Sequence, residues 1–167
     1  IRDRPRAPRP GIPAGREADR QEGFSVLGSR RLLDRYDGNP LLTGRDWPYT
    51  VNTVFNAGAV RLASGETLLL CRVEGRSGLS HLSVVRSPDG FTQWQVEPKP
   101  SFVPDPEHYP EEVWGIEDPR IVWVPELGKY AITYTSYSRG GPGVSLALTE
   151  DFQTFERFGV VMPPEDK

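Results

Sequence analysis

A repeat of 62 residues is the feature of this sequence that most restricts its fold. Asn56 and Asp118 each precede an apolar strand, a tight turn and a second apolar strand, and they are 62 residues apart. Asp89 and Asp151 lie in a later acidic turn of each copy at the same separation, and an aromatic residue follows each turn, the two 61 residues apart. Landmarks that agree on one spacing indicate that the chain builds the same structural unit twice.

Each copy contains the pattern of four short strands. A four-stranded antiparallel unit with a period somewhat above about 40 to 50 residues is typical of a β-propeller blade. One blade cannot bury both of its faces, and a ring usually closes with about 4 to 8 blades. We therefore predict that the chain supplies about two to three blades, as part of a longer propeller chain rather than an open sandwich. The predicted strands span 57–63, 67–74, 79–87, 92–97, 120–125, 129–137, 143–149 and 154–160.

The composition agrees with an all-β fold and argues against several functional classes. Gly and Pro number 17 each and aromatic residues make up 10%, which favours short strands and turns over long helices. A net charge of −3 gives no electrostatic basis for binding nucleic acid or an anionic membrane, and no apolar run approaches the roughly 18 residues of a spanning helix. Two distant histidines and one cysteine do not make a metal site. Cys71, as the single cysteine, excludes an internal disulfide and favours a reducing compartment such as the cytoplasm.

The start of the chain differs in composition from the rest. Residues 1–22 are rich in Arg and Pro and offer almost nothing to bury, which predicts a flexible N-terminal arm. Residues 23–167 carry the strand pattern and are predicted to form the N-terminal part of a propeller domain.

Polar residues stand at equivalent places in the two copies. The first strand of each propeller blade lines the central channel, so we expect Asn56 and Asp118 side by side at one mouth of that channel. Pro119 disfavours an ordinary mid-strand geometry for Asp118. Regular alternation along an extended chain would point Glu117 away from its neighbour.

Arg72 lies near the end of the second strand of its copy, after an apolar run. That position is too late in the strand for an obvious core residue, and the apolar flank is unusual for a simple surface charge. Two plainer interpretations stay open, in which Arg72 is a surface strand end and Asp118 is a turn acid paired with Arg120.

Six stretches of the chain, taken in order, resemble glycoside hydrolase family 130. They are FNAGAV, LLLCRVEG, SVVRSPDG, GIEDPRI, YAITYTSY and the terminal PPEDK, and the resemblance covers about residues 39–167. The combination of GIEDPR with Arg-Val-Glu-Gly is its specific part. The family contains β-mannoside phosphorylases and β-1,2-mannosidases on a five-bladed β-propeller, so the resemblance implies that this chain corresponds to the N-terminal half of such an enzyme.

The resemblance also implies roles for individual residues. Asp118 matches the family's catalytic acid, which donates its proton through the mannosyl 3-hydroxyl while inorganic phosphate attacks the anomeric carbon from the opposite face, giving α-mannose 1-phosphate with inversion. Asn56 and Arg72 match positions that bind the mannosyl unit, and Arg120 is either structural or lines the site. Lys167 matches a lysine that helps to hold phosphate. The implied partners are a β-mannoside oligosaccharide and phosphate, without a cofactor or a metal.

Three other functions stay open at this point. The chain could belong to a hydrolytic β-mannosidase of the same family, or to a five-bladed arabinan- or fructan-type glycosidase, which would require a carboxylate triad on three blades. It could also be a non-catalytic carbohydrate-binding or truncated propeller, and a homo-oligomer is compatible with each. Trp47, Trp114 and Tyr109 are candidates for stacking on sugar rings, whereas the repeat positions of Trp94 and Trp123 predict packing.

Overall fold

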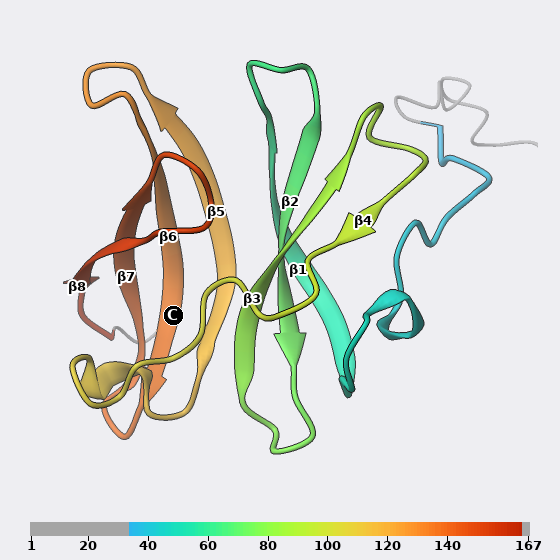
Figure 1. Ribbon diagram of the computed structural model, residues 1–167. Coiled ribbons are helices and arrows are strands. Elements are labelled where there is room, and N and C mark those ends of the chain that lie inside the picture. Colours follow the sequence, from blue (N-terminus) through green and yellow to red (C-terminus); the bar gives the residue numbers. More distant parts are fainter. Residues whose placement is uncertain (1–33, 165–167) are drawn as a thin grey trace, which may run out of the picture. The chain divides into compact units, whose positions relative to one another are not determined.

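Antiparallel strands make up nearly all of the regular structure. The computed structural model describes residues 34–164, so the predicted arm at residues 1–22 and the predicted phosphate ligand Lys167 lie outside the described residues. In the described part, eight strands form two sheets, and the helical elements are two 3₁₀ turns, η1 (Gly44–Asp46) and η2 (Pro110–Glu112). The all-β prediction is confirmed (Figure 1).

The two sheets repeat one topology. In each sheet, strands that follow one another in the chain are hydrogen-bonded neighbours, in the orders β1-β2-β3-β4 and β5-β6-β7-β8. The repeat read from the sequence therefore corresponds to a repeated four-stranded antiparallel unit. The strands are β1 (Thr53–Arg61), β2 (Thr67–Glu74), β3 (Ser80–Ser87), β4 (Gln95–Val96), β5 (Ile116–Val124), β6 (Lys129–Ser138), β7 (Gly141–Thr149) and β8 (Glu156–Met162).

The first strand of each sheet begins earlier than predicted. β1 starts at Thr53 and β5 at Ile116, so Asn56 and Asp118 lie inside strands and not in front of them. The strands run across both positions because each position is a bulge, where the pairing with the next strand shifts its register. An extra residue in one strand keeps the flanking pairs in place and re-aims the bulged side chain.

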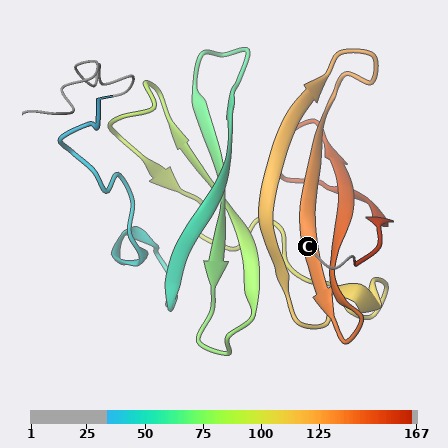
Figure 2. The same cartoon turned by 180° about the vertical axis from the view of Figure 1, so that it is seen from behind.

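The main hydrophobic core lies between the two sheets. A side chain at Gly58 in β1 would meet the carbonyl oxygen of Pro119 in β5 at 2.9 Å, so these strands approach to backbone contact. Figures 1 and 2 show β5 as the strand of its sheet nearest to the first sheet. The core residues are Leu68, Leu70, Leu82, Val84, Phe102, Ile116, Ile132, Tyr134, Ala147 and Phe152.

The other face of the first sheet carries a second core, to which residues 42–51 contribute. Trp47 is only 6% exposed and packs in one cluster with Cys71, Val73 and Val85. Burial raises the pKa of the Cys71 thiol to about 12, which leaves it protonated and unreactive near neutral pH. The reducing compartment inferred from this cysteine stays a prediction.

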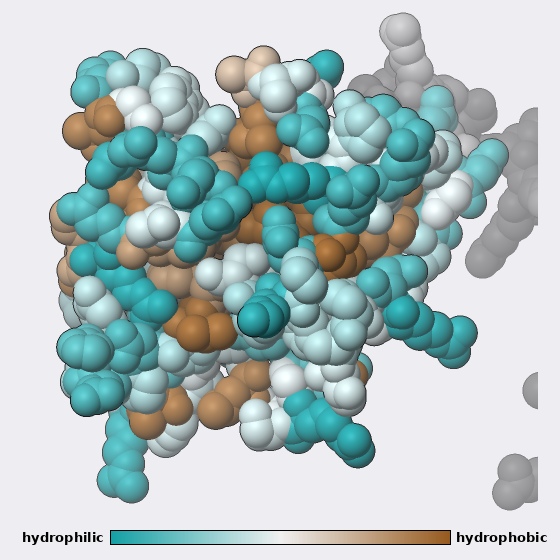
Figure 3. Space-filling model, viewed as in Figure 1, coloured by the Kyte–Doolittle hydropathy of each residue, from teal (hydrophilic) through white to brown (hydrophobic). Residues whose placement is uncertain are grey.

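The second sheet leaves apolar side chains on its far face. Along β7 the buried residues Ser145 and Ala147 alternate with the half-buried Leu146 and Leu148, so one face points to the core and the other does not. Phe158 in β8 is 50% exposed. Figure 3 shows that apolar side chains gather in separate patches between hydrophilic ones on the surface of this view. No helix in the described part of the chain is long and apolar enough to span a membrane.

Candidate active site

Two bulges with the same backbone geometry bring Asn56 and Asp118 together. Their φ angles are 45° and 49°, a region that residues other than glycine rarely adopt. Residues held in this way concentrate at functional sites. Asn56 Nδ2 donates a hydrogen bond of 2.9 Å to Asp118 Oδ1, so the prediction that the two residues lie side by side is confirmed.

Arg72 joins this pair from β2, the neighbour of β1. Its Nη1 donates to Asp118 Oδ1 at 3.1 Å, and its Nη2 donates to Glu117 Oε1 at 2.7 Å. Its Nε donates to Ser80 Oγ at 3.0 Å, and its guanidinium carbon lies 4.3 Å from the centroid of the Phe55 ring. The side chain is 16% exposed. Arg72 is therefore fixed by four partners, and the interpretation of a free surface strand end is wrong.

Glu117 is a member of the cluster that the sequence did not predict. Strict alternation would separate it from Asp118, but the bulge breaks that alternation, and both carboxylates reach the same guanidinium. Burial raises the pKa of Glu117, the charge of Arg72 opposes this shift, and the charges of Asp118 and Glu74 add to it. Two acids thus share one cation at the innermost strand of the second sheet.

Asp118 presents its two carboxyl oxygens to different surroundings. Oδ1 accepts hydrogen bonds from both Asn56 and Arg72, whereas no donor from the described residues faces Oδ2. The side chain is 35% exposed. Oδ2 is therefore the carboxyl oxygen of Asp118 that the described residues leave without a hydrogen bond.

Arg120 follows on the same strand but does not join the cluster. It is exposed, and its Nη1 donates to the carbonyl oxygens of Pro119 at 3.0 Å and of Asp118 at 3.4 Å. The alternative in which Asp118 is a turn acid paired with Arg120 is therefore wrong, because the Asp118 carboxylate bonds to Arg72. A contact between Arg120 and a substrate stays a prediction.

The aromatic residues separate into buried and exposed ones. Trp47 is buried in the core described above and leaves no ring face for a sugar, which corrects the prediction made for it. The ring centroid of Tyr109 lies 5.3 Å from the guanidinium carbon of Arg157. Trp123 packs on Tyr130, with ring centroids 4.8 Å apart. Trp114, just before β5, is 42% exposed.

A buried acid in η2 fixes the segment that leads into β5. Glu112 is fully buried and accepts hydrogen bonds from Tyr134 Oη at 2.7 Å, from Arg157 Nη1 at 2.5 Å and from the Asp105 N–H at 2.8 Å. A buried carboxylate with a cation and two further donors is compensated for its loss of water. Nothing in the local sequence distinguishes Glu112 from Glu111, which is not buried, because Tyr134 and Arg157 come from strands that follow later in the chain.

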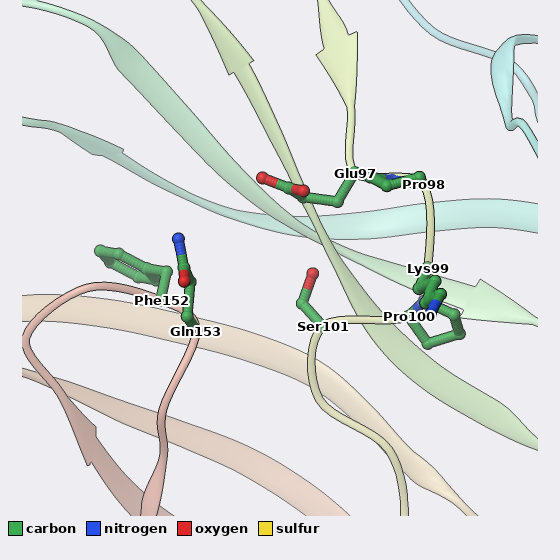
Figure 4. A pocket seen from close by; sticks show the side chains of 7 residues that line it. All are labelled: Glu97, Pro98, Lys99, Pro100, Ser101, Phe152 and Gln153. Carbon is green, nitrogen blue, oxygen red and sulfur yellow. The ribbon is translucent and has the colours of Figure 1, made fainter.

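Other hollows and clusters do not compete with this site. A cavity of about 430 Å³ lies between residues 97–101 and the β7–β8 turn at Phe152 and Gln153 (Figure 4). None of the predicted site residues lines this cavity. The start of β5, which carries the site, pairs with the end of β6, next to the start of β7. The β7–β8 turn lies at the opposite end of β7. The described residues hold no group of three or more side chains suited to a metal ion.

Comparisons with known proteins match most of this chain. A family model described as beta-1,4-mannooligosaccharide phosphorylase matches residues 34–166. The beta-1,2-mannobiose phosphorylase of Listeria innocua is 30% identical over 99 residues, which cover 58% of this chain and 26% of that protein. A solved structure described with family 130 hydrolases that target beta-1,2-mannosidic linkages in Candida mannan is 28% identical, with a TM-score of 0.65, and the match covers 75% of this chain and 40% of that one.

A second solved structure supports the fold alone. It is the Listeria innocua beta-1,2-mannobiose phosphorylase in complex with beta-1,2-mannobiose, at 23% identity and a TM-score of 0.67, covering 80% of this chain and 52% of that one. The chain thus spans about a quarter of the curated relative and about half or less of these two solved chains. Such neighbours are five-bladed propellers, so the two sheets are part of a five-bladed propeller, as predicted.

Proposed function

The chain belongs to glycoside hydrolase family 130, and from this premise we propose that its protein phosphorolyses β-mannosides with Asp118 as the general acid. The products are α-mannose 1-phosphate and the shortened mannoside. The observation that carries the proposal is the cluster in which Asn56 and Arg72 fix one oxygen of Asp118 and leave the other open. The cluster has four members. Glu117 and Asp118 lie in the GIEDPR stretch of the family pattern and Arg72 in its Arg-Val-Glu-Gly stretch, and Asn56 is the fourth.

In the proposed reaction, an oxygen of inorganic phosphate bonds to the anomeric carbon while the glycosidic carbon–oxygen bond breaks on the opposite face. Asp118 gives the proton on Oδ2 to the mannosyl 3-hydroxyl oxygen, and the proton of that hydroxyl passes to the departing glycosidic oxygen. The hydrogen phosphate loses its proton on becoming the ester, and this proton restores Asp118, so no proton is gained or lost overall. Proton transfer by a positioned acid contributes about 10² to 10⁴ in rate.

Asn56 and Arg72 orient the acid and the sugar. Their bonds to Oδ1 fix the rotation of the carboxyl group, so Oδ2 has one direction in which to donate. Arg72 is itself fixed by Ser80 and Phe55, which lets it meet mannosyl hydroxyls without first being ordered. Lys167 is proposed as one ligand of phosphate, on the family pattern. The location proposed for the enzyme is the cytoplasm, where inorganic phosphate is available as the co-substrate.

A hydrolytic β-mannosidase is the second candidate, because the structure at 28% identity is described with hydrolases of this family. An inverting hydrolase needs a second carboxylate as base, about 6.5 to 9.5 Å from the acid on the opposite face of the sugar. Glu117 does not suit that role, since it lies beside Asp118 on the same guanidinium. A base from another part of the protein would be required.

The test of the acid is Asp118→Asn in the full protein. The amide keeps the size of the side chain but has no acidic proton, so turnover of a β-mannoside should fall by about 10² to 10⁴ with an unchanged melting temperature. Glu126→Gln, in the turn at the other end of β5 where the side chain is exposed, is the matched control and should retain full turnover. Full activity of Asp118→Asn would remove both the phosphorylase and the hydrolase from consideration.

A further inference from the structure

An exposed aromatic pair stands directly in front of β5. Trp114 is 42% exposed and Tyr137 is 38% exposed, yet both are held by the backbone. The Trp114 N–H donates to the Tyr137 carbonyl at 2.9 Å, and the Tyr137 N–H donates to the Gly115 carbonyl at 3.1 Å. The rings meet edge to face, with centroids 5.2 Å apart and planes at 72°. The pair is thus a rigid aromatic surface, which loses little conformational freedom when a ligand binds.

A hollow of about 540 Å³ opens beside Trp114. Most of its wall is apolar, with a hydroxyl from the last residue of β6 and a guanidinium from the loop between β6 and β7. A flat apolar wall with a few polar groups matches a pyranose ring, whose C–H faces are apolar and whose hydroxyl groups point outward. The lining residues are Pro106, Pro110, Val113, Trp114, Ser138 and Arg139.

The aromatic pair lies near the candidate active site along the chain. Trp114 precedes Asp118 by four residues on one chain segment, so their Cα atoms are at most about 14 Å apart. Gly115, between them, packs against Ser80, the residue that holds Arg72. We propose that Trp114 and Tyr137 form a platform that binds the sugar units of a mannooligosaccharide beyond the mannosyl unit at Asp118. This inference rests on the proposed function and adds that the site prefers substrates longer than a disaccharide.

The experiment compares substrates of two lengths in the full protein. The ratio of kcat/KM for a β-linked mannotetraose to kcat/KM for the mannobiose is measured in wild type, Trp114→Ala and Trp114→Phe. We expect the ratio to fall about tenfold in Trp114→Ala, the factor that corresponds to 1.4 kcal/mol, and by less in Trp114→Phe, which keeps an aromatic face. Trp123→Ala is the matched control, because Trp123 is 44% exposed on the same segment near the other end of β5, and it should leave the ratio unchanged.

An unchanged ratio in Trp114→Ala, or an equal fall in Trp123→Ala, would overturn the platform. Binding of mannotetraose, followed by chemical shifts of the indole N–H groups, separates this inference from the proposed function. If the wild type turns over no mannoside, a Trp114 indole shift that saturates with mannotetraose still supports the platform. The absence of that shift overturns the platform whether or not the protein is active.

Discussion

Arg72 holds Glu117 and Asp118 through two separate nitrogens, and this sharing gives the site its electrostatic character. One positive charge faces two carboxylates, and Glu117 is the more deeply placed of the two, with 23% of its side chain exposed against 35% for Asp118. The sequence identified Asn56, Arg72 and Asp118 through the repeat and the family pattern. It missed Glu117, because the rule of alternating side chains fails at a bulge and no local signal marks the bulge except Pro119.

Glu117→Gln should change how stability depends on pH. Burial raises the pKa of Glu117 above its ordinary value of 4.5, with Arg72 opposing the shift. The folded state then binds this proton more tightly than the unfolded state, so the wild type loses stability as pH rises from about 4.5 through the folded pKa. Glutamine does not titrate, so the melting temperature of the variant should rise relative to wild type across that interval. Thermal melts between about pH 4 and 7 test this, and a constant difference would contradict it.

Among the elements, the start of β5 carries the site, and two contacts fix it from outside the strand. Glu112 in η2 binds Arg157 from β8 and Tyr134 from β6, and Gly115 packs on the backbone of Ser80 in β3. The strand pattern of the sequence located β5 through its apolar run at Ile121–Val124. It placed the first residue too late, because the polar, proline-containing stretch in front of that run does not look like a strand.

Gly115→Ala should lower both stability and activity. Its φ of +107° disfavours a side chain, and a Cβ there would lie 2.9 Å from the Ser80 nitrogen. Backbone strain of this kind costs on the order of 1 to 3 kcal/mol, and a shifted Ser80 would release the Nε of Arg72. Gly65→Ala is the control, since Gly65 has a φ of +91° with nothing within 4 Å of the added carbon. We expect both variants to have a lower melting temperature than the wild type, but only Gly115→Ala to have a lower kcat/KM. Equal kcat/KM in the two variants would contradict the role given to Ser80.

At the scale of the whole molecule, the two blades bury one face of the second sheet and leave the other apolar. Met162 in β8 is 56% exposed and is paired with Val144, one of the half-buried residues of β7, and a propeller blade normally packs on both neighbours. The repeat predicted this architecture well, because strand length and turn chemistry are local properties. Contacts between side chains far apart in the sequence, such as those of Glu112, depend on how the segment before β5 packs on the second sheet, and no local pattern encodes them.

Residues 34–164 produced alone should therefore self-associate or unfold at low temperature. The uncovered face and the open edge of β8 would pair with further copies instead of the missing neighbours. Light scattering coupled to size exclusion gives the molar mass, and a melting curve gives the cooperativity. A monodisperse monomer with a sharp transition at ordinary temperatures would show that the two blades are sufficient by themselves. A homo-oligomer of the full protein stays a separate prediction.

The central claim is that phosphate, and not water, attacks a mannoside activated by Asp118. Its most direct measurement is the product formed from a β-mannoside by the full protein with and without inorganic phosphate, followed by ³¹P and ¹H NMR. We predict α-mannose 1-phosphate in step with substrate consumed, and almost no turnover when phosphate is left out. Free mannose released at the same rate in both conditions would contradict phosphorolysis and establish the hydrolase instead.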